Sequence, residues 1–533
     1  MFTNKLLLCV IAIMLSFGGV HALNDMPLLA ELSGEHPQSC FGYSVVSLDF
    51  NHDGYDDLIV YSMAYGHQNS QSPSRGKVYI YYGGPNFSSA SEPAMTLEGD
   101  YPNGTQRRIR YIRNIGDVSG DGYDDLLISD AIPGPSGLYV EGSERYMLYF
   151  GGTNDLSTPD RIEIPQMNEV IYKIDMLKDV DGDGYDDVGI SYAINYLHCH
   201  DILWGGSFQR QMILCGGGGF HDIMAITGIG DINNDGFDDF SIGYLDAQKA
   251  DDQYSTIRVY YGNISREFSE FNLLIHTPNY ITRVCKPLGD LNNDGFDDFL
   301  GYIDSSGMKI WLGSNNPLTL EPDVVLNPIY YGDILVNGVK SGDFNGDGFS
   351  DVVGASYYLR RYAVWLGSTS MNGFVDYQKY SSIEQFGWDV AVGDFNGDGC
   401  DDIAVSAPSN DWPASSFTGY VFVYAGNPGM VANDDQFAPP LTEGINMLIS
   451  PNPVRRDGVL RLSLRGADKY VGMPVKVEVF NIKGQAVQQT ETPQSYTHDY
   501  SAELNLSGLA SGVYLCRATI GKQAVNKKVT IIK

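Results

Sequence analysis

The nine-residue stretch Asp179-Val180-Asp181-Gly182-Asp183-Gly184-Tyr185-Asp186-Asp187 decides the fold of this chain. It places carboxylates at loop positions 1, 3, 5 and 9 and a glycine at position 6. A hard cation such as Ca²⁺ takes roughly six to eight oxygen ligands. A loop with an oxygen at every second residue and a sharp turn at glycine can surround such an ion. The stretch therefore predicts a calcium-binding loop.

The same loop occurs seven times in one frame, at intervals of 51 to 68 residues. An apolar strand precedes each loop, a second strand follows it at once, and a third ends in glycine, as at 41–49, 57–62 and 77–84. A fourth strand is weaker, as at 95–99. Four short strands repeated seven times predict a β-propeller, with a linear solenoid as the alternative. The loops begin at Asp49, Asp117, Asp179, Asp231, Asp290, Asp343 and Asp394.

The two ends of the repeats favour a closed ring over a solenoid. Residues 28–34 have the pattern of a fourth strand without its blade. Only two strands follow the seventh loop before the composition changes. We therefore expect the N-terminal strand to complete the last blade, so that no sheet edge stays open.

Charge and hydropathy restrict the function. The 533 residues carry a net charge of −32, which argues against binding nucleic acid or an anionic membrane surface and suits cation binding. Residues 1–22 predict a signal peptide, with Lys5 ahead of an apolar run too short for a transmembrane helix. No later stretch is apolar enough to span a bilayer, so we expect an exported chain without a transmembrane segment.

The C-terminal part has a different composition. Residues 431–446 form a linker rich in Pro, Asn and Asp, and 445–533 hold 12 Lys and Arg against 6 Asp and Glu. Alternating apolar and polar runs then predict a small β-sandwich over 447–533. The predicted fold class is all-β: a seven-bladed β-propeller over 23–430 with a C-terminal immunoglobulin-like β-sandwich.

The repeats resemble the FG-GAP (VCBS-like) repeats of integrin α-subunit propellers. The match lies in Phe41-Gly42, Phe386-Gly387, Ser406-Ala407-Pro408 and the seven loops, whereas the middle repeats keep only the loop and strands. The resemblance covers about residues 24–430. It implies that the side chains at positions 1, 3, 5 and 9 and the backbone carbonyl at position 7 bind Ca²⁺, with up to seven structural ions.

The residues implied as calcium ligands follow directly from these positions. The side-chain ligands are Asp49, Asn51, Asp53, Asp57, Asp117, Ser119, Asp121, Asp125, Asp179, Asp181, Asp183, Asp187, Asp231, Asn233, Asp235, Asp239, Asp290, Asn292, Asp294, Asp298, Asp343, Asn345, Asp347, Asp351, Asp394, Asn396, Asp398 and Asp402. The carbonyl donors are Tyr55, Tyr123, Tyr185, Phe237, Phe296, Phe349 and Cys400.

Position 12 separates these loops from other calcium motifs. An EF-hand needs a glutamate there. The residues found are Val60, Ile128, Ile190, Ile242, Gly301, Gly354 and Val405, none of which has a side-chain ligand. The Asp179 loop alone has four carboxylate ligands, so the charge count predicts it among the tightest sites and the Ser119 loop among the weakest.

The C-terminal segment resembles the type A sorting domain of the type IX secretion system. The match lies in Pro451-Asn452-Pro453, 479–487, 509–514 and 528–533. The resemblance implies a partner, the type IX secretion machinery, and a product that is secreted or attached to the cell surface. A generic immunoglobulin-like module is the alternative.

No catalytic motif stands out in the sequence, and most aspartates belong to the loops. We expect structural calcium sites in a cell-surface binding or adhesion protein. Its ligand, an unknown protein or glycan, would bind on the face opposite the calcium loops. The alternative is a secreted polysaccharide lyase or hydrolase. Its active site would come from the variable inserts 63–76, 130–144 and 246–255, with residues such as Arg75, Lys77, Glu141, Glu144 and Arg145.

Cysteines and histidines offer one further candidate site. Cys199 and Cys215 can bridge neighbouring strands, but we expect buried free thiols, which are the commoner state of strand cysteines. The run His198-Cys199-His200-Asp201 suggests a transition-metal site. Strand residues of this kind more often have a structural role.

Overall fold

The computed structural model describes residues 25–532 except 38, 66–74, 100–106, 133–142, 154–155, 164–168, 196, 219–224, 246–254, 278–284, 305–306, 317, 319, 327–337, 409–417, 433–445, 451–453, 456–458, 466–474, 482–484, 493–499, 507–508 and 521–522. The predicted signal peptide and most of the predicted linker lie outside the described residues. No helix in the described part is long and apolar enough to cross a membrane. The chain divides into two compact units, Met1–Asp435 and Gln436–Lys533.

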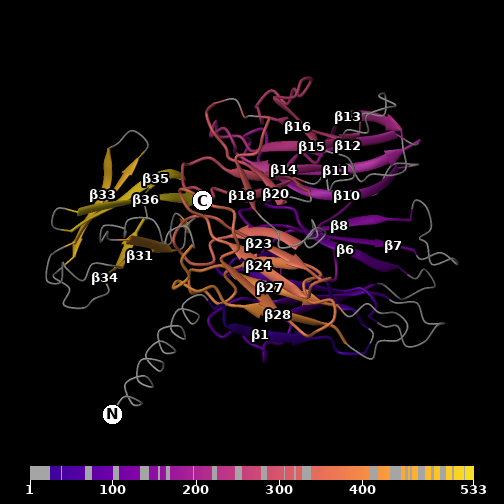
Figure 1. The fold of residues 1–533 in the computed structure, drawn as a ribbon, viewed down its shortest axis with the longest axis horizontal. Helices are drawn as coiled ribbons and strands as arrows, with labels where there is room; N and C mark the ends of the chain where they lie inside the picture. The colour runs from indigo at the N-terminus through magenta and orange to yellow at the C-terminus, as the bar shows by residue number, and fades with distance from the viewer. Residues whose placement is uncertain are drawn as a thin grey trace, which may run out of the picture. The chain divides into compact units, whose positions relative to one another are not determined.

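Unit 1 contains, in its described residues, seven four-stranded antiparallel sheets (Figure 1). Six are built from consecutive strands. These are β2 (Phe41–Leu48), β3 (Asp57–Ser62), β4 (Lys77–Tyr81) and β5 (Met95–Glu98); β6 (Arg108–Asn114), β7 (Leu126–Ala131), β8 (Arg145–Tyr149) and β9 (Arg161–Glu163); β10 (Glu169–Lys178), β11 (Asp187–Ile194), β12 (Leu197–Leu203) and β13 (Arg210–Gly218); β14 (Ile226–Gly230), β15 (Asp239–Leu245), β16 (Ser255–Tyr260) and β17 (Leu273–Thr277); β18 (Lys286–Gly289), β19 (Asp298–Asp304), β20 (Gly307–Trp311) and β21 (Val324–Leu326); and β22 (Val339–Gly342), β23 (Asp351–Ser356), β24 (Arg361–Trp365) and β25 (Tyr377–Tyr380).

The last sheet of unit 1 closes the ring. It consists of β26 (Val390–Gly393), β27 (Asp402–Ala407), β28 (Tyr420–Tyr424) and, at its outer edge, β1 (Leu28–Ser33). Leu28 is opposite Tyr424 and Ser33 is opposite Tyr420, so the indigo β1 lies beside the orange β28 in Figure 1. The first strand of each sheet contacts that of the next, and β26 contacts β2. The predicted propeller and its closure by the N-terminal strand are confirmed, and the solenoid alternative is wrong.

The apolar core lies between neighbouring sheets. The second strands β3, β7, β23 and β27 are buried along their whole length, as in DLIVYS of β3 and DIAVSA of β27, because each sheet is covered on both faces. Leu48, Ile59 and Tyr61 of the first sheet pack with Ile112 and Ile128 of the second. The continuous apolar runs that directly follow each loop are therefore the central elements of the blades.

Unit 2 consists of two sheets. β29 (Asn446–Ser450), β31 (Val459–Arg465) and β34 (Tyr500–Asn505) form one sheet. The other contains β30 (Val454–Arg455), β36 (Gln523–Ile532), β35 (Gly512–Ile520), β32 (Val475–Asn481) and β33 (Ala486–Thr492). Leu462 and Leu504 of the first sheet share a core with Val477, Cys516 and Val529 of the second. Two sheets around one core form a β-sandwich, as the alternation of apolar and polar residues predicts.

Candidate metal centres

Each loop is the connection between the first and second strands of its own sheet. The glycine at position 6 has a φ between 88 and 95° in all seven loops. Position 4 is also left-handed and is His52, Gly120, Gly182, Asn234, Asn293, Gly346 or Gly397, with φ between 55 and 75°. Only glycine, and less often asparagine or another short polar residue, adopts this backbone readily. The two left-handed residues wind the chain tightly enough to turn alternate side chains inward.

The first aspartate organises the loop by accepting two backbone hydrogen bonds. In the first loop Asp53 N donates to Asp49 Oδ1 at 3.1 Å, and Gly54 N donates to Asp49 Oδ2 at 3.0 Å. The fifth side chain is held in the same way, since Tyr55 N donates to Asp53 Oδ1 at 3.1 Å. The bond from position 7 to position 5 recurs in all seven loops. The ligand side chains are therefore pre-positioned by the loop's own backbone.

The ninth aspartate ties the loop to the sheet. Asp57 Oδ2 accepts a hydrogen bond from Phe50 N at 3.1 Å, and its Oδ1 accepts one from Gly83 N at 2.9 Å. Gly83 follows the third strand, so one carboxylate joins the ends of three strands. Every loop repeats the bond to the glycine, at 2.7 to 2.9 Å. The glycine at the end of each third strand is thereby explained.

Burial makes this carboxylate difficult to ionise without a cation. All seven ninth aspartates are fully buried. Burial raises the pKa of Asp57 to about 7, and the carboxylates of Asp49 and Asp53 raise it further, against the backbone hydrogen bonds. Burial likewise raises the pKa to about 8 at Asp125, Asp187, Asp239, Asp298 and Asp402, and well above the ordinary value at Asp351.

The residues present fit a calcium ion. Asp179, Asp181 and Asp187 each turn a carboxylate oxygen to within 4.8 Å of the others. The donor set in every loop consists of oxygen atoms, which suit Ca²⁺. A bound cation would supply the positive charge that these crowded carboxylates lack. Positions 1, 3, 5 and 9 of each loop, with the carbonyl of position 7, are therefore the residues that would hold it.

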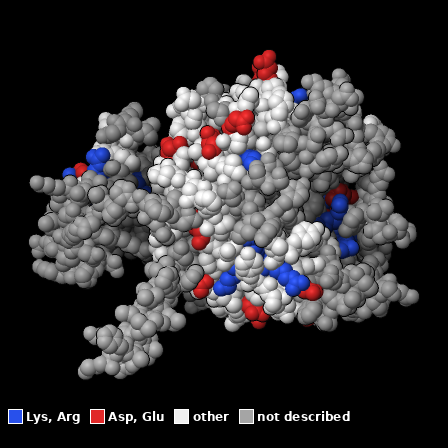
Figure 2. All heavy atoms as spheres, in the orientation of Figure 1, with Lys and Arg blue, Asp and Glu red and all other residues white. Residues whose placement is uncertain are grey.

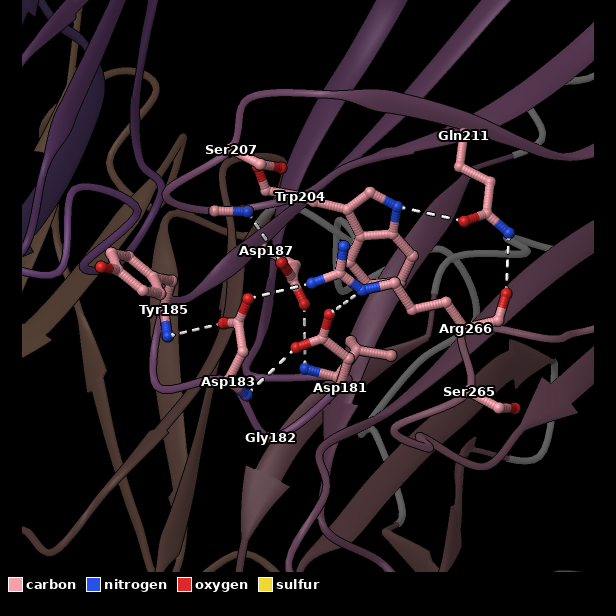
Figure 3. A network of polar contacts seen from close by, with 12 residues as sticks. Asp181, Gly182, Asp183, Tyr185, Asp187, Trp204, Ser207, Gln211, Ser265 and Arg266 are labelled. Atoms are coloured by element: carbon pink, nitrogen blue, oxygen red, sulfur yellow. Dashed lines mark hydrogen bonds and ion pairs between the residues drawn. The ribbon is translucent and has the colours of Figure 1, made fainter.

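The third loop has a protein cation beside it, which the sequence did not reveal. Arg266, between β16 and β17 of the next sheet, pairs through Nε with Asp181 Oδ2 and through Nη2 with Asp183 Oδ2 at 2.9 Å (Figure 3). The guanidinium lies 4.5 Å from the centroid of the Trp204 ring. Gln211 Nε2 donates to the carbonyl of Arg266 at 2.8 Å and links it to Trp204 Nε1. The four-carboxylate loop is thus partly neutralised by its neighbour.

Arg266 takes the place of an amide donor found in other loops. The third-position asparagine of the first, fifth and sixth loops donates its Nδ2 to the fifth-position carboxylate at 2.9 to 3.1 Å. Asp181 cannot donate, and Arg266 Nη2 does so instead. The guanidinium of Arg266 therefore offsets the extra negative charge of Asp181. A comparison of calcium affinity between the loops must include this positive charge.

The eighth residue connects neighbouring blades, a role that the sequence prediction missed. Asp186 N donates to the carbonyl of Asp117 in the preceding blade at 2.9 Å, and Asp117 N donates back to Asp186 Oδ2 at 3.0 Å. Five pairs have both bonds: Asp186 with Asp117, Asp238 with Asp179, Asp297 with Asp231, Asp401 with Asp343 and Asp56 with Asp394. We call this arrangement the inter-blade latch. Its last pair joins the seventh blade to the first.

Charged residues of the inserts proposed as enzyme candidates form ion pairs where they are described. Lys77 Nζ lies 2.7 Å from Glu35 Oε1, and Arg110 pairs with Glu144. Arg145 Nε donates to Asp130 Oδ1 at 3.0 Å. Glu141 and most of the three inserts lie outside the described residues. The described pairs hold strands and loops together.

The histidine and cysteine candidates have structural roles. Cys199 and Cys215 are directly opposite on β12 and β13 and form a disulfide, so the expectation of free thiols is wrong. Their register makes them a cross-strand pair, which spacing along the chain does not specify. His200 is buried with its Nδ1 3.0 Å from Ser191 Oγ, and burial lowers its pKa to about 3. His198 Nδ1 lies 3.2 Å from Tyr172 Oη.

Comparisons with known families agree with these repeats. Residues 41–81 and 386–424 match the FG-GAP repeat, and residues 448–533 match the secretion system C-terminal sorting domain. The two FG-GAP matches are the first and last blades, which keep Phe41-Gly42 and Phe386-Gly387. Both phenylalanines are fully buried.

Individual relatives share part of the propeller. Mouse integrin alpha-IIb is 28% identical over 169 residues, 30% of this chain and 15% of the relative. Integrin alpha-5 of Xenopus laevis is 34% identical over 118 residues, 21% of this chain and 11% of the relative. The chain thus spans less than a fifth of the length of these relatives. The Cps50 (Swd1) β-propeller domain of Myceliophteria thermophila aligns with a TM-score of 0.40 and 10% identity, over 72% of this chain and 96% of that one.

The sequence matches and the ring of repeated sheets lead to one conclusion. The chain carries FG-GAP repeats in an all-β propeller and a C-terminal sorting domain of the type IX secretion system.

Proposed function

We propose that this protein is an exported, calcium-stabilised FG-GAP propeller that binds a protein or glycan at the cell surface or in the secreted state. The sorting domain indicates export to the surface or the exterior. The calcium proposal depends on the environment of the ninth aspartate. This aspartate is buried in every loop and connects three strand ends, so a cation bound there stabilises the whole blade.

The calcium ions are structural in this proposal. Each loop offers four side chains and one carbonyl, which leaves few positions for a substrate. Up to seven ions would bind, one for each loop. The ligands belong to one blade, while the eighth residue joins that blade to the preceding one, so calcium binding and ring closure stabilise each other.

Calcium content and melting temperature test this part of the proposal. We expect dialysed protein to bind close to seven Ca²⁺ per chain by elemental analysis, and excess EDTA to lower the melting temperature by about 10 °C or more. Mg²⁺ should restore less of the stability than Ca²⁺, because it requires a more rigid octahedral geometry. An unchanged melting temperature in EDTA would contradict a stabilising role.

The binding function is tested on the same protein. The full-length chain, loaded with Ca²⁺, is applied to a glycan array and incubated in parallel with uronic-acid and neutral polysaccharides. Retention on defined glycans without a fall in polymer length supports a binding protein. Release of oligosaccharides would favour the alternative, a lyase or hydrolase on a propeller scaffold.

A further inference from the structure

A basic cluster lies on the innermost strands of unit 1 and belongs to no calcium loop. Its members are Arg113 on β6, Lys173 on β10, Lys286 on β18 and Lys340 on β22. These strands are the first strands of four blades, and the first strands of adjacent blades contact one another around the ring. The charges of Lys286 and Arg113 act on both Lys173 and Lys340, so the four side chains lie near one another at the centre of the ring. We call them the channel cluster.

Two carboxylates accompany the channel cluster, and both have partners in the protein. Asp175 Oδ2 lies 2.7 Å from Lys173 Nζ, which also donates to Thr227 Oγ1 at 3.2 Å. Asp389 Oδ2 accepts hydrogen bonds from Ser44 Oγ at 3.0 Å and Val45 N at 3.1 Å. The four cations thus exceed the two carboxylates by two charges, in a part of the chain that is otherwise strongly acidic.

Two members of the cluster have no partner of opposite charge at close range. Within the described residues, Lys286 and Lys340 take part in no ion pair and no side-chain hydrogen bond. Lys340 is exposed to solvent, and Lys286 is half-buried. Ammonium groups are donors only, and no described side chain is an acceptor for these two, so an anion bound between them would supply one.

The proximity of these cations lowers the pKa of two of the lysines. The pKa of Lys340 is lowered to about 8, because the surrounding strands crowd its ammonium group although part of the side chain still reaches solvent, and because Lys286 adds positive charge, while Asp389 and Asp175 oppose this. The pKa of Lys173 is lowered to about 8 by burial, and Lys286 and Arg113 contribute, although Asp175 opposes this. A bound anion would remove this unfavourable energy.

We propose that the channel cluster of Arg113, Lys173, Lys286 and Lys340 binds a tetrahedral oxyanion group, a sulfate or a phosphate, in the centre of the propeller. Such a group accepts hydrogen bonds from several donors at once, which matches donors that arrive from separate blades. The eighth-position aspartates lie at the end of the ring that carries the calcium loops and would repel an anion there. The proposal is independent of the calcium sites and of the surface-binding function.

Inorganic sulfate is the probe, since phosphate precipitates with calcium. The full-length protein is kept in constant Ca²⁺ and constant ionic strength while sulfate replaces chloride. We expect one sulfate per chain by equilibrium dialysis and a rise in melting temperature. The double variant Lys286→Gln/Lys340→Gln should lose at least about tenfold in sulfate affinity. It should melt above the wild type in chloride, because two unpaired cations are gone.

Lys379→Gln is the matched control, because Lys379 is a lysine on the outer strand β25 with a long 3.5 Å ion pair to Asp25. It should keep the sulfate affinity of the wild type. Binding should also weaken as the pH rises from 7 to 9, because the pKa values of Lys173 and Lys340, which face Arg113, Lys286, Asp175 and Asp389, are about 8 and both lysines lose their protons in this range. Absence of sulfate binding, or equal binding by wild type and double variant, would overturn the proposal.

A sulfated disaccharide separates the two sources of such a group. Binding at least about tenfold tighter than inorganic sulfate, and lost in the double variant, would identify the group as part of a glycan. Binding of inorganic sulfate alone would identify a free ion. Both outcomes support the channel site, and they differ in whether it contributes to glycan recognition.

Discussion

The ninth aspartate of a loop has two separable contributions to stability. One comes from its two buried backbone hydrogen bonds, and the other from the cation that it helps to hold. In the fourth loop these bonds run from Ile232 N at 3.1 Å and Gly262 N at 2.8 Å to Asp239. The third-position Asn233 of the same loop is half-buried, and its Oδ1 accepts a hydrogen bond from Asp235 N at 2.9 Å.

We therefore predict that Asp239→Ala destabilises the protein with and without calcium. It leaves the buried Gly262 N without its acceptor and Ile232 N with only the carbonyl of Gly230 at 3.1 Å, which together cost about 1–3 kcal/mol of unfolding free energy. Asn233→Ala is the matched control and should cost less than about 1 kcal/mol in EDTA. Urea unfolding of both variants in EDTA measures the difference. Equal losses would show that the ninth aspartate acts only through the ion.

The third loop allows a test of how a neighbouring positive charge changes calcium affinity. Arg266→Gln removes the guanidinium beside Asp181 and Asp183 and should raise the affinity of this loop by about tenfold, because a cation no longer repels the incoming ion. Arg266→Lys keeps the charge and should stay near the wild type. The amide signals of Gly182 and Gly184 in a Ca²⁺ titration report this site. A lower affinity in Arg266→Gln would mean that the arginine positions the ligands.

At the residue scale, the loop positions could be predicted because ligand spacing is local. Positions 1, 3, 5 and 9 lie within one turn of chain, so their grouping needs no knowledge of the tertiary fold. Arg266 is 83 residues from Asp183 and comes from the next blade, and no spacing along the chain connects the two. The prediction that the Asp179 loop is among the tightest sites counts only the charges of its own side chains, and the guanidinium of Arg266 opposes it.

At the scale of the blades, the inter-blade latch is the recurring hydrogen-bond contact between neighbouring loops. Six of the seven loops have aspartate at position 8, a regularity that is visible in the sequence. Its partner is the loop of the preceding blade, which only the closed fold brings near. Ser350 keeps the backbone bond to the carbonyl of Asp290, at 2.9 Å. Asp124 instead accepts from Asn114 Nδ2 of its own blade at 2.9 Å.

We predict that Asp56→Ala lowers the melting temperature more than Asp124→Ala in saturating calcium. Asp56 Oδ2 accepts from Asp394 N at 2.9 Å and joins the first blade to the last, so its loss weakens ring closure. We expect a loss of about 1–3 kcal/mol for Asp56→Ala and under about 1 kcal/mol for Asp124→Ala. Differential scanning calorimetry compares the two. The reverse order would show that the latch does not limit unfolding.

Strand identity could be predicted better than strand pairing. The second strands have continuous apolar runs, because both of their faces are covered, and their positions follow from the loops before them. The disulfide between Cys199 and Cys215 depends instead on the register of β12 against β13, which contains irregularities on both sides of the pair. A register of that kind is determined by packing across the sheet rather than by local sequence.

At the scale of the whole molecule, charge is the property that calcium changes most. The chain carries −32, and seven bound ions would add about +14, leaving roughly −18. We predict that electrophoretic mobility toward the anode falls by roughly 40% on calcium saturation at constant ionic strength. Capillary electrophoresis during a Ca²⁺ titration measures this. A change of less than a tenth would correspond to at most one ion and would contradict seven sites.

The ring and its closure could be predicted from the whole chain because the ends of the repeats are incomplete. The central channel could not. Arg113, Lys173, Lys286 and Lys340 stand 4, 6, 4 and 3 residues before the first aspartate of their loops, so they share no single loop position. Their convergence depends on seven strands meeting at one axis, and this geometry exists only after closure.

The pairing of β1 with β28 also has a consequence for the order of the chain. Residues 28–33 belong structurally to the blade that ends at 424, and Gly34 N donates to the carbonyl of Gly419 at 3.2 Å. A circular permutant that joins this strand to the end of β28 and starts at the first blade would keep every sheet intact. It would turn the last blade into one uninterrupted segment. Comparing its refolding rate with that of the native order would measure the kinetic cost of waiting nearly four hundred residues for a partner strand.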